Sequence, residues 1–167
     1  RGVVLTASGK KTALKVIRRH RLIETFLNKV LGFSWDEVHA EAEKLEHHIS
    51  ERLTEAIAEY LNHPDYDPHG DPIPPKGGKL KVDHRQSLSA TPVGETVQVA
   101  RVRHHDSEML RYLDQVGIHL NTLVTVIEKA PFKGPITVRI GPQRVAPLKT
   151  IGLNIAEDIL VNLIDKN

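Results

Sequence analysis

Six side chains with the chemistry of metal ligands recur at helical spacing in the first third of the sequence. They are His20, Glu24, His39, Glu43, Glu46 and His47. The last four fall within an arc of about 100° when they are placed on an α-helix, and the first two share one face of another helix. Imidazole and carboxylate groups bind Mn²⁺, Fe²⁺, Zn²⁺ and Co²⁺. Two packed helices would therefore present three imidazoles and three carboxylates to one cleft.

Apolar residues border this polar stripe. The neighbouring arc carries Trp35, Val38, Ala42, Leu45 and Ile49, so the candidate ligands lie at the edge of a buried face. A metal site is one interpretation of the stripe, and a solvated charged helix face is the other. A two-metal hydrolase would use the same ligand types, but the sequence has neither a glycine-rich phosphate loop nor an HExxH motif.

The composition is that of an ordinary globular protein. The chain has 167 residues, of which 40% are hydrophobic and 26% charged, enough for one domain or two small ones. It contains no cysteine, so disulfides and thiolate ligands are excluded. The sequence shows no secretory leader and no apolar run near the ~20 residues that a membrane span needs. We therefore expect a cytoplasmic protein without membrane contact.

Charge is distributed unevenly along the chain, although the net charge is only +2. Residues 1–21 carry seven cations and no acid, whereas residues 22–71 carry twelve acids and three cations. The cationic end favours a surface near phosphate or a solvated helix face. The acidic segment also holds five of the ten histidines, which agrees with a divalent-metal site.

The hydrophobic periodicity predicts three helices in the first half, over residues 7–31, 35–48 and 51–61. The residues that precede them are typical helix caps: Thr6, Ser34 and Ser50. A segment rich in proline and glycine follows, over residues 64–78.

The second half is predicted to be mainly β. Alternating apolar residues predict strands over residues 96–102, 123–127, 136–140 and 143–147. A helix is expected over residues 106–116, and residues 155–161 are consistent with a short helix or a strand. This pattern favours a small barrel.

The motifs in residues 5–9, 18–24, 38–50 and 67–74 closely resemble the diphtheria toxin repressor family of metal-dependent transcriptional repressors. The second half is similar in layout to the SH3-like, iron-transport-accessory-type domain of the longer members. The resemblance implies an α+β protein in which an all-α helical dimerisation domain precedes a small SH3-like β-barrel domain.

The resemblance also implies domain boundaries. Residues 1–75 match the metal-binding and dimerisation domain, and residues 1–6 match a remnant of the DNA-binding wing. A linker is expected at residues 76–90 and the SH3-like domain at residues 91–167. On this alignment the three DNA-binding helices and the N-terminal ligands of the primary metal site lie outside the chain, which we interpret as a fragment.

The resemblance assigns the candidate ligands to two sites. The primary, activating site matches Glu43, Glu46 and His47. The ancillary site matches His20, Glu24 and His39. In longer members the SH3-like domain completes it, here through His105 and Glu108.

The function implied is a homodimeric repressor of metal-uptake genes, not an enzyme, in which bound metal fixes a winged helix-turn-helix for operator DNA. Glu43 stands where iron-responsive members use sulfur and manganese-responsive members use a carboxylate, which favours Mn²⁺ over Fe²⁺, Zn²⁺ or Co²⁺. Operator DNA would bind through the N-terminal domain, with Lys10, Lys11 and Lys15 beneath the wing.

Dimerisation also has support from the apolar residues themselves. The first and third helices carry more of them than one three-helix unit needs: Leu27, Val30, Leu31, Leu53, Ile57 and Leu61. A symmetric dimer would cover this surplus, although the second domain is an alternative cover. Two other functions stay open at this stage, a metal-sensing or metal-buffering module without DNA binding and a dinuclear metallohydrolase.

Overall fold

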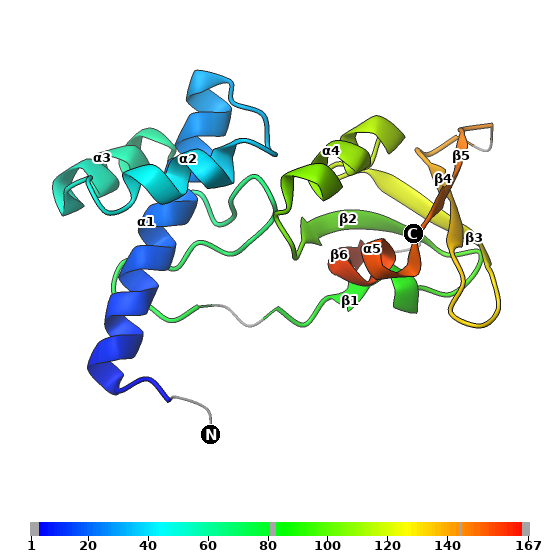
Figure 1. The fold of residues 1–167 in the computed structure, drawn as a ribbon, viewed down its shortest axis with the longest axis horizontal. Helices are drawn as coiled ribbons and strands as arrows, with labels where there is room; N and C mark the ends of the chain where they lie inside the picture. The colour runs from blue at the N-terminus through cyan, green and yellow to red at the C-terminus, as the bar shows by residue number, and fades with distance from the viewer. Residues whose placement is uncertain (1–3, 81–82, 144, 165–167) are drawn as a thin grey trace. The chain divides into compact units, whose positions relative to one another are not determined.

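The computed structural model describes residues 4–80, 83–143 and 145–164. The chain divides into two compact units, residues 1–82 and residues 83–167, which are described separately. We call the first the helical unit and the second the sheet unit (Figure 1). None of the helices in the described residues combines the length and apolar composition that a bilayer crossing needs.

The helical unit is built on one long helix, α1 (Ala7–Leu31). Thr6 begins it, because its Oγ1 accepts a hydrogen bond from the backbone N–H of Gly9 at 3.1 Å. Gly32 ends it with φ at 74°, a left-handed conformation that favours glycine. Both predicted boundaries of this helix are confirmed.

The second helix is shorter than predicted. Residues 35–37 form a turn, and α2 spans Val38–Leu45, followed by a second turn at residues 46–48. The early turn has a local cause, because the Ser34 hydroxyl donates to Glu37 Oε2 at 2.6 Å instead of capping a helix. The prediction of a helix over residues 35–48 was therefore wrong at both ends.

The third helix, α3 (Glu51–Tyr60), begins at Ser50, whose Oγ accepts from the backbone N–H of Leu53 at 3.1 Å. The helices pack through two buried clusters. One contains Leu22, Ile57, Ala58 and Ile73, and the other contains Ile23, Leu27, Val38 and Ala42. Two residues expected to contribute apolar surface to a dimer, Leu27 and Ile57, are thus buried in the core of their own unit.

The segment after α3 is fixed along α1. Arg18 Nη1 donates to the carbonyl of Pro74 at 3.0 Å, and Arg21 Nη1 donates to the carbonyl of Pro72. Ile73, between these two carbonyls, is part of the core. This proline-rich segment is therefore an ordered part of the helical unit.

The sheet unit is one antiparallel six-stranded sheet with the order β1-β6-β2-β3-β4-β5. Its strands are β1 (Gln86–Ser87), β2 (Thr96–Val102), β3 (Leu123–Lys129), β4 (Ile136–Ile140), β5 (Leu148–Ile151) and β6 (Ile159–Leu163). The helices are a 3₁₀ turn at Leu88–Ala90, α4 (Ser107–Val116) and α5 (Leu153–Asp158). Valines and isoleucines alternate inward along β2, β3 and β4, which gives this unit its own core.

Strands β2 and β4 and helix α4 lie where they were predicted, and the α+β class is confirmed. The strand predicted at residues 143–147 is absent from its described residues, where Ala146 N–H donates to the carbonyl of Gln143 at 3.0 Å, and residue 144 lies outside the described residues. The strand β5 begins after Pro147, because proline has no N–H to donate to β4. The C-terminal segment forms both structures considered for it, α5 and then β6. Strand β1 lies inside the segment expected as a linker.

Candidate metal centre

Three of the predicted ligands meet on the face that α1 presents to α2. Glu24 Oε1 lies 3.0 Å from His20 Nε2 and 3.0 Å from His39 Nδ1, and the two histidine nitrogens are themselves 3.0 Å apart. All three ligand atoms lie within 4.8 Å of one another. The predicted grouping of His20, Glu24 and His39 is thus present in the geometry.

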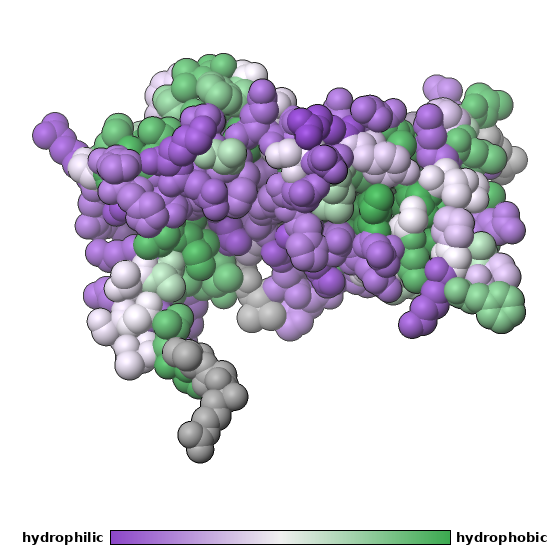
Figure 2. Space-filling view, in the orientation of Figure 1, coloured by the Kyte–Doolittle hydropathy of each residue, from purple (hydrophilic) through white to green (hydrophobic). Residues whose placement is uncertain are grey.

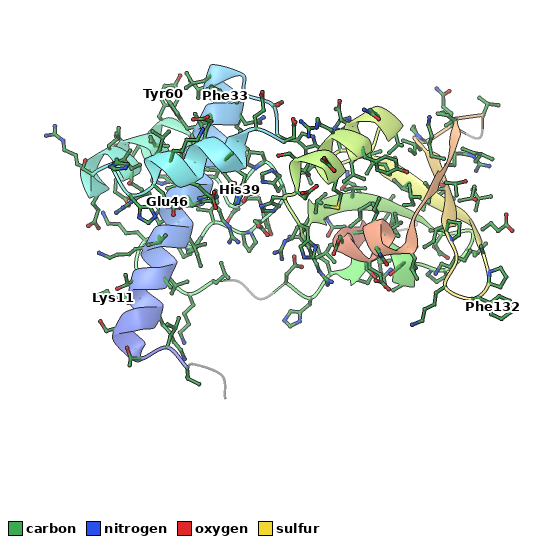
Figure 3. The ribbon with its side chains drawn as sticks, in the orientation of Figure 1. Lys11, Phe33, His39, Glu46, Tyr60 and Phe132 are labelled. Atoms are coloured by element: carbon green, nitrogen blue, oxygen red, sulfur yellow. The ribbon has the colours of Figure 1, made fainter. Side chains whose placement is uncertain are left out.

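Packing between the helices creates this arrangement. Ile23 and Leu27 of α1 pack on Val38 and Ala42 of α2, so that the polar edge of each helix lies beside the other. Figure 3 shows His39 and Glu46 projecting next to α1, where hydrogen bonds join both to His20.

Glu24 is the electrostatic centre of the cluster. Its side chain is 0% exposed, and burial alone would raise its pKa. Hydrogen bonds and the charge of His20, with help from His69 and His39, outweigh burial and lower the pKa of Glu24 to about 2. A buried carboxylate that stays ionised needs positive charge beside it.

His20 lies between two carboxylates. Its Nε2 faces Glu24, and its Nδ1 lies 2.7 Å from Glu46 Oε2. Burial by itself would lower the pKa of His20, but the hydrogen bonds and charges of Glu24 and Glu46 raise it above the ordinary value of 6.5. A protonated His20 would place a positive charge between the two carboxylates.

The predicted primary site is only partly assembled. Glu46 Oε1 lies 3.1 Å from His47 Nε2, which follows it in the turn after α2. Glu43 Oε1 lies 3.7 Å from His39 Nε2, and its side chain is 65% exposed. Glu43, Glu46 and His47 do not converge as His20, Glu24 and His39 do.

The side chains fit a divalent cation. The second carboxylate oxygen of Glu24, Oε2, is buried, and no group in the described part of the chain hydrogen-bonds to it. A buried acceptor without a donor costs free energy unless something else binds it. Imidazole nitrogens and carboxylate oxygens around it are the donor set of Mn²⁺, Fe²⁺ or Zn²⁺ sites.

Two further polar residues beside Glu24 were not among the predicted ligands. His69 is fully buried, with Nδ1 3.9 Å from Glu24 Oε1 and Nε2 donating to the carbonyl of Trp35 at 2.7 Å. Asp67 is buried as well and accepts from the backbone N–H of His69 at 2.9 Å. Both lie on an irregular segment without hydrophobic period, so only their residue types within residues 67–71 signalled them.

Arg21 supplies the charge that balances this segment. Its guanidinium lies 3.7 Å from Asp67 Oδ2 and 3.2 Å from Asp71 Oδ2. Burial, with the nearby negative charges of Glu24 and Asp71, still raises the pKa of Asp67 well above its usual range. Burial lowers the pKa of His69, which favours the neutral imidazole that a metal ligand requires.

The other predicted residues are carried by other elements of the chain. His105 precedes Asp106, the N-cap of α4, and Glu108 is in the first turn of that helix, in the sheet unit. Their completion of the ancillary site stays a prediction. Lys10, Lys11 and Lys15 lie on the N-terminal half of α1, and Lys15 Nζ is 3.6 Å from Glu51 Oε2.

Comparison with known proteins decides the family. Residues 6–75 match the model of the iron-dependent repressor metal-binding and dimerisation domain, and residues 86–163 match the FeoA domain. The iron-dependent repressor IdeR of Mycobacterium tuberculosis is 34% identical over 158 residues, covering 87% of this chain and 68% of that protein. The chain belongs to the iron-dependent repressor family.

Solved structures of manganese-dependent relatives are also similar to this family member. A manganese-dependent transcriptional repressor in complex with manganese is 42% identical, with a TM-score of 0.90 over 98% of this chain and 76% of that chain. The manganese regulator SloR is 29% identical, with a TM-score of 0.82 over 98% of this chain and 74% of that chain. The predicted order of a helical domain followed by a small SH3-like domain is thereby confirmed.

Proposed function

We propose that this chain is the metal-sensing and dimerisation part of a Mn²⁺-dependent transcriptional repressor of metal-uptake genes. The observation that carries the proposal is Glu24, a fully buried, ionised carboxylate between His20 and His39 with one oxygen that lacks a donor in the described residues. The family membership supports the assignment of this cluster to a repressor.

The donor set supports manganese. All candidate ligands are carboxylates and imidazoles, and the sequence has no cysteine to offer a softer ligand. Glu43 occupies the position at which the resemblance places sulfur in iron-responsive members. Two relatives in solved structures are described as manganese-dependent or manganese-regulating.

We assign the ancillary site to His20, Glu24 and His39, completed by His105 and Glu108, and the primary site to Glu43, Glu46 and His47. Bound metal would supply the positive charge that offsets repulsion among the carboxylates of Glu24 and Glu46 and their neighbours. His20 supplies that charge only when it is protonated, because a neutral imidazole carries no positive charge to either carboxylate. The orientation of α1 relative to α2 would therefore depend on whether a metal ion is bound between these side chains or His20 is protonated.

A homodimer would cover the apolar side chains that the helical unit leaves in solvent. They include Val30, Leu31, Phe33, Leu53 and Tyr60, of which Leu53 is 47% and Tyr60 70% exposed. The family model that matches this unit is named for dimerisation as well as metal binding. A symmetric dimer is the commonest way in which such a face is buried.

Operator DNA would bind through a winged helix upstream of α1, with Lys10, Lys11 and Lys15 close to the phosphates. Cationic side chains at that place would add affinity that is independent of base sequence and falls with salt. A repressor that binds operator DNA would work in the cytoplasm.

The proposal is tested by Mn²⁺-dependent DNA binding of the intact repressor, this chain joined to its winged helix, on its own promoter fragment. We expect retention of the fragment with Mn²⁺, and its loss in Glu46→Gln and Glu43→Ala but not in Glu59→Gln, an exposed carboxylate on α3. Equal retention by Glu43→Ala and the unchanged protein would contradict the primary-site assignment.

A metal-buffering module without DNA binding is the second candidate, because His20, Glu24 and His39 converge within the helical unit alone. Saturable Mn²⁺ binding by an intact repressor that never retains its promoter fragment would favour it. The named relatives are repressors, which points away from a metallohydrolase.

A further inference from the structure

A groove separate from the metal cluster runs along the N-terminal half of α1. It has a volume of about 500 Å³ and lies between α1 and the segment of residues 75–79, within the helical unit. Small-molecule sites in proteins commonly have volumes of roughly 300–1,000 Å³. The groove is thus large enough for a small organic ligand.

Two hydrogen bonds hold the second wall of the groove in place. Arg18 donates to the carbonyl of Pro74 at 3.0 Å, which fixes the start of the second wall against α1. That wall then turns back, because the backbone N–H of Gly78 donates to the carbonyl of Pro75 at 3.0 Å. A Cβ at Gly78 would lie 2.4 Å from Pro75 Cγ, so the turn has this close approach only with glycine.

Its lining combines apolar atoms with unpaired positive charge. Leu14, Ala7 and Pro75 contribute apolar surface, and lysine side chains cover more of it with their methylene stems. Lys10, Lys11 and Lys79 line the groove and form no ion pair with any residue that the structure describes. Figure 3 marks Lys11 on the lower half of α1, where Figure 2 shows hydrophobic side chains among hydrophilic ones.

Two other cations in the groove differ from these three. Lys15 and Arg18 are already paired, with Glu51 at 3.6 Å and with Glu55 at 3.2 Å. The Nε atom of Arg18 is nevertheless buried without a hydrogen-bond partner among the described residues. None of the described residues that line the groove is a carboxylate, so the charged side chains among them are all positive.

We propose that this groove binds a small organic anion with an apolar body, such as an aryl or acyl phosphate. The three unpaired lysines would take the anionic group, and the surface around Leu14 and Pro75 would take the apolar body. A bare phosphate backbone needs the cations but not the concave apolar wall, which is why the lining favours an amphipathic small molecule over nucleic acid. The site does not depend on metal and is separate from the metal ligands assigned above. It shares Lys10 and Lys11 with the surface proposed to lie close to operator phosphates, so the small anion and DNA would compete for these two side chains.

The test uses three matched probes: 1-naphthyl phosphate, 1-naphthol and inorganic phosphate. Calorimetric titration of the 167-residue chain, with and without Mn²⁺, should show saturable 1:1 binding of 1-naphthyl phosphate. The two partial probes should bind at least ~10-fold more weakly, because each lacks half of the interaction. Inorganic phosphate binding as tightly as 1-naphthyl phosphate would overturn the proposal in favour of a simple anion site.

Variants locate the binding. Lys79→Glu combined with Lys11→Glu should weaken 1-naphthyl phosphate at least ~10-fold through charge repulsion. Lys29→Glu, at the other end of α1 and outside the groove, is the matched control and should leave the affinity unchanged. Equal affinity in the double variant and the control would overturn the proposal. Tighter binding of a short DNA duplex, lost in the same double variant, would overturn it in favour of a nucleic-acid surface.

Discussion

His20 Nδ1 lies 2.7 Å from Glu46 Oε2, while its Nε2 lies 3.0 Å from Glu24 Oε1. One imidazole therefore joins a residue assigned to the ancillary site to a residue assigned to the primary site. Any ligand that takes an electron pair from His20 changes the partners of both carboxylates. This shared histidine gives the two sites a direct physical connection within the helical unit.

Replacing Glu24 by glutamine should lower the pKa of His20. The change removes the buried charge that raises this pKa and keeps the size of the side chain. The pKa can be followed by NMR titration of the imidazole in the metal-free protein. Glu59→Gln, at an exposed position of α3, is the control and should leave the His20 titration where it was. An unchanged titration in Glu24→Gln would show that Glu24 does not hold the proton on His20.

Mn²⁺ affinity should rise with pH through the neutral range. A metal ligand must be a neutral imidazole, and the raised pKa of His20 means that protons still compete above pH 6.5. The same shift gives the metal-free protein stability at low pH that is lost as the pH rises through the raised pKa. Calorimetry at about pH 6 and about pH 8 should show the higher affinity at the higher pH. Affinity independent of pH would exclude His20 as a ligand.

Replacing Arg21 by methionine should lower the free energy of unfolding by about 3 kcal/mol. The substitution leaves Asp67 and Asp71 buried without their cation and removes the hydrogen bond to Pro72. Denaturant unfolding measures the change. Arg52→Met, at an exposed position of α3, should cost less than about 0.5 kcal/mol. A similar cost for both variants would mean that the Arg21 network adds nothing to stability.

Replacing Leu53 by glutamate should convert the proposed dimer into a monomer. The charge would lie in the apolar face of the helical unit, where Leu53 is 47% exposed. Sedimentation velocity at micromolar concentration distinguishes the two states. The same substitution at Leu163, an exposed residue of β6, should leave the dimer intact. A monomer for the unchanged protein would contradict the dimer itself.

Local rules predicted the elements whose ends depend on a single residue. Thr6 and Gly32 define α1 because each has a side chain or backbone geometry that permits little else. The ends of α2 could not be predicted in this way. There the Ser34 hydroxyl donates to Glu37 instead of capping a helix. The sequence pattern does not show which of these two hydrogen bonds forms.

The same distinction applies to the candidate site: residues on helices could be predicted from the sequence, and residues on irregular segments could not. His20, Glu24 and His39 were predictable because helical spacing places each of them on a defined face. His69 and Asp67 lie on an irregular segment that tertiary contacts with Trp35 and Arg21 hold in position. Helical or strand periodicity does not encode such contacts. Only the structure therefore shows that His69 and Asp67 lie near Glu24.

A calorimetric titration of this chain with Mn²⁺, comparing the unchanged protein with His39→Ala, tests whether the buried cluster around Glu24 binds metal. His48→Ala is the matched control, because His48 is an exposed histidine in the same stretch of chain with no contact to Glu24. We expect saturable binding that His39→Ala weakens at least ~10-fold and His48→Ala leaves unchanged. Equal binding by all three proteins would contradict the assignment of the buried cluster as a metal site.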